Sequence, residues 1–245
     1  MVSETKPFKL LRSRNFEQLK AGFQQTGRCQ LGNFLPGSKA KKLRRVLDEL
    51  PWHLVFNKGP EHVEFNKSEQ TALTPELRAA IAEQAWERSQ SEFQYFYENY
   101  PVFDILNGPN PIDRLLAQIY ATMNSADTLR MVKELTGESA DFCDMQATRY
   151  SAGHFLTEHH DDVVGKNRKL AYVINLSLSW KPEWGGILQF IGDDGVIMEG
   201  FLPRFNSLSI FKVPVMHRVS AVGESVSANR LALTGWFRTH AADAA

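Results

Sequence analysis

The feature that most constrains the fold is a change of pattern near residue 141. Before it, apolar residues recur three and four positions apart, which is typical of helices. After it, short apolar runs are separated by Gly, Pro, Asn and Asp, which is typical of strands joined by turns. Strands are expected at residues 142–150, 153–158, 169–178, 186–191, 195–201, 206–212, 215–222 and 229–237. Short strands at this spacing favour a double-sheet jelly roll.

The first 140 residues are expected to be mainly helical. The pattern predicts helices over 39–50, from Thr74 towards Tyr97, after Pro111, and over 126–135. Thr74 is a hydroxyl cap followed by Pro75, and Gly137 is a typical helix end. Helices followed by strands favour an α+β fold, with the N-terminal helices packed on one sheet of a double-stranded β-helix, a cupin-like barrel. Residues 1–140 would support a core at 141–240 within one structural unit.

Composition limits the setting and the partners. Twenty-eight basic residues balance twenty-eight acidic ones, so neither nucleic-acid binding nor a membrane surface is expected. Cys29 and Cys143 lie far apart, which argues against a disulfide framework and favours a reducing cytoplasm. No apolar run approaches the roughly 20 residues that span a bilayer, and no export segment is visible at the N-terminus. A cytoplasmic protein is expected, with its oligomeric state open.

A set of metal-ligand types lies in the strand-rich half. His159, His160, Asp161 and Asp162 contain two His-x-Asp registers, and His217 follows on a later strand. Residues two apart on a strand share a face, so either register can offer an imidazole and a carboxylate to one ion. Two histidines and one carboxylate leave part of the metal open, which is the ligand set of non-heme Fe(II) oxygenases. The residues alone do not decide between the registers.

Several motifs then occur in a fixed order along residues 145–238. They are Tyr150-x-x-Gly153-x-Phe155-Leu156, His160-x-Asp162, Trp184-Gly185-Gly186-x-Leu188, His217-x-Val219 and Arg230-x-Ala232-x-Thr234-x-Trp236-Phe237. This order resembles the 2-oxoglutarate- and Fe(II)-dependent dioxygenases, in particular the prolyl-hydroxylase branch. The run from His160 to Val163, followed by Arg168 to Tyr172, is most similar to the subgroup that hydroxylates a proline of a small-subunit ribosomal protein. The resemblance of residues 1–140 is much weaker.

The resemblance implies roles for individual residues. It favours His160, Asp162 and His217 as Fe(II) ligands, because Tyr150 then lies ten residues before the metal histidine. Arg230 would bind the distal carboxylate of 2-oxoglutarate as a planar fork. Tyr150 and Thr234 would add hydroxyl hydrogen bonds to the same cosubstrate. Asn175 stands where many prolyl hydroxylases carry a tyrosine, so a contact from it to the cosubstrate stays open.

The expected activity is hydroxylation of a prolyl residue of a protein. It would consume O2 and 2-oxoglutarate and release succinate and CO2, with ascorbate as a candidate reductant; a ribosomal protein is a candidate partner. One alternative is the same chemistry on a free amino acid or small metabolite. A second is a non-catalytic, cupin-like metal-binding sensor. Arg230 argues against that second alternative, because a metal site without turnover has no need of a dicarboxylate clamp.

Overall fold

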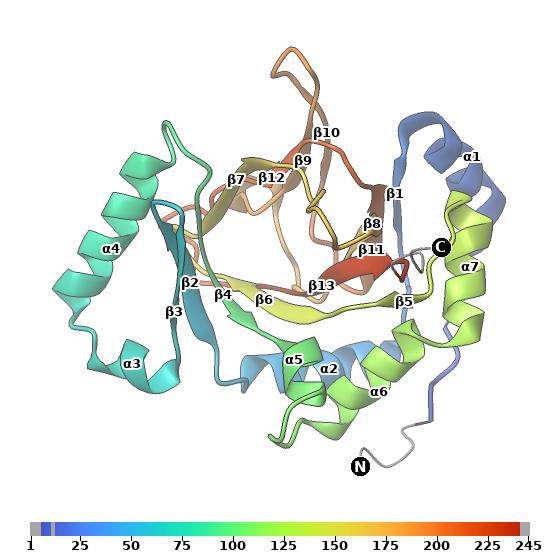
Figure 1. Cartoon of the computed structure of the whole chain (residues 1–245), viewed down its shortest axis with the longest axis horizontal. Coiled ribbons are helices and arrows are strands. Elements are labelled where there is room, and N and C mark those ends of the chain that lie inside the picture. The colour runs from blue at the N-terminus through green and yellow to red at the C-terminus, as the bar shows by residue number, and fades with distance from the viewer. Residues whose placement is uncertain (1–5, 11–12, 241–245) are drawn as a thin grey trace.

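The computed structural model describes residues 6–10 and 13–240. Its centre is a strongly curled antiparallel sheet with most helices below and to one side of it (Figure 1). The strand order is β1-β11-β8-β13-β6-β4-β7-β12-β9-β10, with β2 and β3 continuing from β4, and β5 paired with β13. The α+β jelly-roll prediction is therefore confirmed.

The strands are β1 (Arg28–Leu31), β2 (His53–Lys58), β3 (Glu61–Phe65), β4 (Tyr95–Tyr100), β5 (Phe142–Cys143), β6 (Gln146–Tyr150), β7 (Phe155–His159), β8 (Arg168–Asn175), β9 (Leu188–Ile191), β10 (Ile197–Phe201), β11 (Ser207–Lys212), β12 (His217–Val219) and β13 (Arg230–Arg238). The helices are α1 (Phe16–Thr26), α2 (Gly37–Asp48), α3 (Lys67–Ala72), α4 (Pro75–Arg88), α5 (Val102–Leu106), α6 (Arg114–Met123) and α7 (Ala126–Thr136), with a 3-10 turn at Pro182–Trp184.

The two outer edges of the curled sheet are joined by side chains. Arg28 on β1 forms an ion pair with Glu199 on β10, with 2.7 Å between Nε and Oε2. Gln30 on β1 donates a hydrogen bond to the carbonyl of Leu202, just after β10. These contacts bring the ends of the sheet together, so the barrel is nearly closed.

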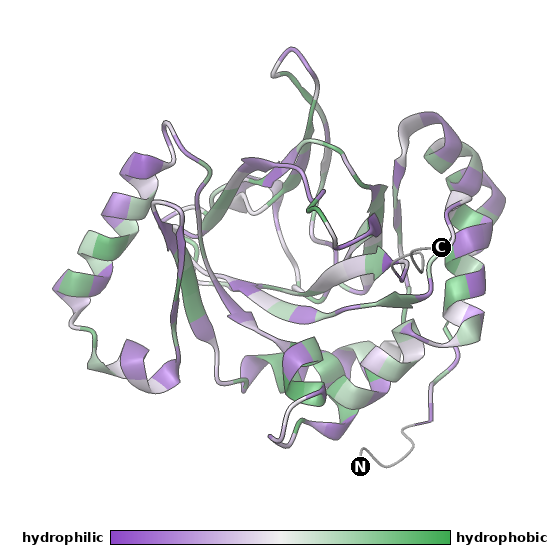
Figure 2. Ribbon diagram, viewed as in Figure 1, coloured by the Kyte–Doolittle hydropathy of each residue, from purple (hydrophilic) through white to green (hydrophobic). Residues whose placement is uncertain are grey.

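The main core lies between the outer face of the sheet and the helices. Leu43 and Leu47 of α2, Leu116 of α6 and Leu135 of α7 are fully buried in it. Apolar and polar patches alternate along α7 in Figure 2, as expected of a helix with one buried face. The predicted helix end at Gly137 is confirmed, since this residue has a φ of +82°. None of the helices in the described part of the chain is long and apolar enough to cross a membrane.

The N-terminal part is less helical than the sequence predicted, since it contains β1–β4 as well as α1–α7. The helix that begins at Thr74 ends at Arg88 and does not continue to Tyr97. Residues 95–100 instead alternate between half-buried and buried positions as strand β4, which pairs with β2, β6 and β7. The aromatic residues of this segment suit a strand as well as a helix face. The first 140 residues thus contribute β1–β4 to the same sheet as the later strands.

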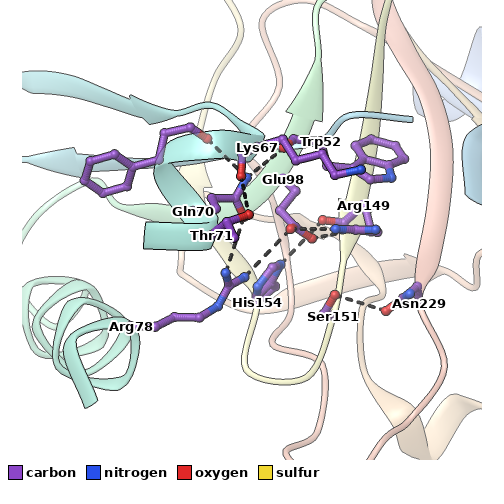
Figure 3. A network of polar contacts seen from close by, with 11 residues as sticks. Trp52, Lys67, Gln70, Thr71, Arg78, Glu98, Arg149, Ser151, His154 and Asn229 are labelled. Atoms are coloured by element: carbon purple, nitrogen blue, oxygen red, sulfur yellow. Dashed lines mark hydrogen bonds and ion pairs between the residues drawn. The ribbon is translucent and has the colours of Figure 1, made fainter. Parts of the chain in front are cut away.

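A buried ion pair lies on the outer side of the sheet, where α3 and α4 approach it (Figure 3). Glu98 on β4 accepts two hydrogen bonds from Arg149, its cross-strand partner on β6, each of 2.6 Å. Arg78 of α4 lies 3.7 Å from the same carboxylate and donates to Gln70 of α3. The Glu98 side chain is 3% exposed. Through Arg78, this buried carboxylate connects α4 to the outer face of the sheet.

Candidate active site

A cavity of about 810 Å³ occupies the inside of the barrel. Its walls are inner-face residues of β4, β6, β7, β8, β12 and β13, which alternate with the residues that face the helices. On β6, for example, Thr148 and Tyr150 line the cavity, whereas Arg149 faces the outer side. Because successive side chains point to opposite faces, one strand contributes residues both to the cavity and to the packing against the helices.

One group of metal-ligand side chains lies in this cavity. His159 at the end of β7, Asp161 just after it and His217 at the start of β12 have ligand atoms that all lie within 4.8 Å of one another. The Asp161 carboxylate is 3.7 Å from Nε2 of His159 and 3.4 Å from Nε2 of His217. β7 and β12 are neighbours, with His217 directly opposite His159, and this pairing sets the two imidazoles side by side.

Both imidazoles are oriented by the backbone. Nδ1 of His159 is 2.9 Å from the carbonyl of Thr157, and Nδ1 of His217 is 2.9 Å from the carbonyl of Val215. A carbonyl only accepts, so each ring donates from Nδ1 and turns its Nε2 towards Asp161. Burial lowers the pKa of His217 to about 4, and the nearby His159 adds to this effect, so His217 is neutral near pH 7. Neutral, oriented imidazoles are the form that ligates a metal.

The structure does not bring together the register that the resemblance favoured. His160 and Asp162 are both exposed, while Asp161 is buried beside His217. His160 lines the outer part of the cavity, and Asp162 is not among its lining residues. The chain leaves strand geometry after His159, so spacing from Tyr150 could not determine which residues turn inwards. The structure thus gathers His159 and Asp161 with His217, whereas the resemblance favoured His160 and Asp162 with His217.

Arg230 enters the same cavity from β13. Its side chain is 2% exposed, its guanidinium carbon lies 4.9 Å from the centre of the Tyr150 ring, and its Nε has no hydrogen-bond partner. No carboxylate among residues 6–10 and 13–240 forms an ion pair with it, and burial lowers its pKa from the ordinary value. Gly186 leaves room for the Arg230 side chain. A Cβ at position 186 would lie only 3.1 Å from Arg230 Cδ, which is closer than an ordinary van der Waals contact. A buried cation without an acid partner is costly, which points to an anionic ligand.

The other expected cosubstrate residues divide into two groups. Tyr150 and Thr234 both line the cavity, and Tyr150 stacks on Tyr97 with 5.0 Å between the ring centres. Asn175 is absent from the lining residues, and its amide donates to Ser207 and Ser209 of β11. Asn175 is thus engaged within the barrel wall.

The sequence did not predict a binding role for four further residues that line the cavity, namely Thr148, Asn99, Arg168 and Trp236. The hydroxyl of Thr148 and the amide oxygen of Asn99 are buried without partners, on adjacent positions of β6 and β4. The guanidinium carbon of Arg168 lies 3.5 Å from the centre of the Trp236 ring, and Arg168 donates a hydrogen bond to the carbonyl of Asp161. Nε of Arg168 and Nε1 of Trp236 are both buried without a hydrogen-bond partner. Unpaired buried polar atoms in a cavity indicate where a polar ligand would be held. No sequence signal distinguishes them from ordinary strand residues.

Comparison with known proteins agrees with this geometry. Residues 145–238 match the model of the 2OG-Fe(II) oxygenase superfamily, which takes 2-oxoglutarate and Fe(II). The jelly-roll barrel, the His-Asp-His group and the buried arginine agree with this match, which covers residues 145–238. The resemblance inferred from the motifs is thereby confirmed.

Within that class, the similar relatives are prolyl hydroxylases. The chain is 36% identical over 101 residues to prolyl 3-hydroxylase OGFOD1 of Xenopus laevis and 34% identical to the protein of that name of Mus musculus. Each match covers 38% of this chain and only 19% or 18% of the relative, so the matched segment spans under a fifth of these proteins.

Solved structures share the fold over nearly the whole chain. A prolyl-4-hydroxylase of Pseudomonas putida superposes with a TM-score of 0.60 at 19% identity, covering 92% of this chain and all of that one. A Trichoplax adhaerens prolyl hydroxylase, solved with a hypoxia-inducible-factor peptide, gives 0.58 at 15%, covering 92% and 89%. The α-ketoglutarate-dependent epimerase SnoN of nogalamycin biosynthesis gives 0.55 at 12%, covering 91% and 82%. One fold thus carries different reactions.

Proposed function

We propose that this protein is an Fe(II)- and 2-oxoglutarate-dependent dioxygenase that hydroxylates a prolyl residue of a protein. The observation that carries the proposal is the presence of two complementary features in one cavity. His159, Asp161 and His217 offer three metal ligands, and Arg230 offers a buried cation without an acid partner. A metal-binding sensor would need the first feature and not the second.

The donor set fits a ferrous ion. Two imidazoles and one carboxylate are the facial set of non-heme Fe(II) oxygenases, in contrast to the thiolate-rich sites of structural zinc. His159, Asp161 and His217 would hold the ion. When bound, iron supplies the oxygen activation that couples decarboxylation of 2-oxoglutarate, to succinate and CO2, with hydroxylation of a C–H bond.

The remaining residues bind and orient. Arg230 would grip the distal carboxylate of 2-oxoglutarate as a fork, and the Tyr150 ring beneath the guanidinium excludes water from that end. Thr148, Asn99 and Thr234 offer side-chain oxygens along the same inner wall. Arg168 and Trp236 also line the cavity and present unpaired N–H donors that suit the carbonyl groups of a substrate chain.

A prolyl residue is the target that the sequence relatives support. Both curated relatives are named prolyl 3-hydroxylases, and the motif resemblance makes a small-subunit ribosomal protein the substrate to test first. Fold similarity cannot choose the substrate, because an epimerase shares the same barrel.

The test is incubation with Fe(II), 2-oxoglutarate and O2, with ascorbate present or absent, followed by measurement of succinate and of oxygen gained by substrate. Proline-containing peptides from the host proteome would be analysed by mass spectrometry beside free proline and other amino acids. A prolyl residue that gains one oxygen, with matching succinate, is the expected result. Oxygen gained only by a free amino acid would move the assignment to a small metabolite. Absence of succinate under all conditions would leave a metal-binding protein without turnover.

A further inference from the structure

A second hollow adjoins the main cavity. This hollow has a volume of about 550 Å³ and is lined by Asn57, Gly59, Pro60, Glu92, Phe93 and Tyr95. Phe93 and Tyr95 also line the main cavity, so the two hollows meet at these side chains and are together called the groove. The two hollows together offer more room than a single amino acid fills.

Two strands shape the rim of this groove. β4 and β7 pair at Tyr95 with Leu156, and Gln94 exchanges hydrogen bonds with Thr157 one step further out. The same register sets Phe93 opposite Glu158. The Phe93 and His159 rings are 5.4 Å apart, so this rim adjoins the metal group directly.

The rim is apolar and acidic. Phe93 is 47% exposed, and both Glu92, which lines the second hollow, and Glu158, which lines the main cavity, are exposed. Neither carboxylate forms an ion pair within the described ranges, and the second hollow has no Lys or Arg among its lining residues. Arg168, the cation of the nearby wall, is turned inwards by its bond to the Asp161 carbonyl and its stacking on Trp236.

We propose that the substrate is an extended polypeptide with a lysine or arginine close to the target residue, and that Glu92 and Glu158 bind this cation beside the ring of Phe93. This inference rests on the proposed function, since it describes the polypeptide that the same site would take. Two unpaired carboxylates attract a basic side chain and repel an acidic one, and an exposed aromatic face adds a cation–π contact.

Direct binding of peptides gives the test. Fluorescence anisotropy would be measured without O2, in the presence of Fe(II) and 2-oxoglutarate, so that binding is observed without turnover. Three fluorescent proline-containing peptides would differ only in one flanking residue, which is Lys, Gln or Glu. We expect the Lys peptide to bind about fivefold more tightly than the Gln peptide and the Glu peptide more weakly than both. The differences should shrink when NaCl is raised from about 50 mM to 500 mM, where charges are screened.

Charge variants identify the groups responsible. The double variant Glu92→Gln, Glu158→Gln should bind the three peptides alike, and the double variant Glu92→Lys, Glu158→Lys should prefer the Glu peptide. Glu83→Gln, an exposed acid on α4, is the matched control and should keep the wild-type order. Equal binding of all peptides by the wild type, or an unchanged preference in the double Gln variant, would overturn the inference.

Failure of the proposed function gives a different result. If oxygen is then admitted and every bound peptide gains one oxygen regardless of its flanking charge, prolyl hydroxylation stands and the charge preference is wrong. If succinate forms and no peptide either binds or gains oxygen, the polypeptide substrate itself is wrong.

Discussion

Tyr150 carries the buried guanidinium of Arg230 on the face of its ring, with 4.9 Å between the guanidinium carbon and the ring centre. The two residues are also directly opposite each other on β6 and β13. Strand pairing therefore holds the Arg230 cation inside the barrel, where a bound ligand would supply the compensating negative charge.

We expect Arg230→Met to weaken 2-oxoglutarate binding about a hundredfold, because the buried carboxylate would lose its partner while the side-chain volume is kept. The measurement is the 2-oxoglutarate KM for succinate formation, together with Co(II) binding followed by visible absorption. Co(II) binding should persist. Arg204→Met, at an exposed position, is the control. An unchanged KM in Arg230→Met would remove Arg230 from the cosubstrate site.

The choice of metal register gives a second prediction. His159→Ala and Asp161→Ala should each weaken Co(II) binding more than about a hundredfold, because each removes a ligand and not merely a supporting group. His160→Ala and Asp162→Asn should bind Co(II) nearly as well as wild type, since both side chains are exposed. Isothermal titration of the four variants is the check. Strong loss in His160→Ala with retention in His159→Ala would restore the register that the motif spacing favoured.

The Glu98–Arg149 pair predicts an asymmetric loss of stability. The Glu98 side chain is 3% exposed and that of Arg149 is 24% exposed. Arg149→Met leaves a buried carboxylate with only the more distant Arg78, whereas Glu98→Gln leaves a guanidinium that water can reach. We expect the first to cost about 3 kcal/mol or more and the second less, by urea unfolding.

The exposed pair Arg130–Asp127 provides the control for these two variants, and Arg130→Met should cost under about 0.5 kcal/mol. Equal losses for Arg149→Met and Glu98→Gln would mean that the burial of the carboxylate does not govern the pair.

His154 predicts how stability depends on pH. Burial lowers its pKa to about 4, although the nearby Glu98 acts in the opposite direction. The unfolded chain binds a proton near pH 6.5 and the folded chain does not, so stability falls as pH drops from about 6.5 towards 4. By this linkage, His154 alone accounts for about 2 kcal/mol lost between pH 7.5 and pH 5.

The replacement His154→Gln should remove that part of the pH dependence, as measured by urea unfolding at the two pH values. The two proteins differ in this one titratable side chain, so the difference between their slopes is assigned to the histidine. Replacing the exposed His62 by Gln should leave the wild-type slope. A slope in His154→Gln as steep as that of wild type would contradict the assignment.

The sequence predicted the barrel better than its surroundings. Each expected strand after residue 141 overlaps a strand of the structure, because turn residues separate short apolar runs there. The segment 95–100 was missed as a strand because aromatic residues suit both a helix face and a strand, and only pairing with β2 and β6 decides between them.

In the candidate site, too, the sequence predicted residue types better than it predicted which side chains face the cavity. Residue types and their order pointed to His217 and Arg230, and both residues line the cavity. They could not choose between adjacent His-x-Asp registers, since that choice depends on where the chain turns after His159. Nor could they reveal that Thr148 and Asn99 face the cavity unpaired, because partners on other strands determine which atoms are left over.

The contact between Arg28 and Glu199 has a consequence for how much of this chain is needed to make a stable barrel. β1, which carries Arg28, covers the edge of β11 and lies outside the segment 145–238 that defines the family. Cut down to that segment, the barrel would expose the hydrogen-bonding groups of β11 and of β6, and uncovered edges of this kind pair with other copies. We therefore expect residues 145–238 on their own to aggregate. In the whole chain, β1 and β4 cover these edges and prevent strand pairing between molecules.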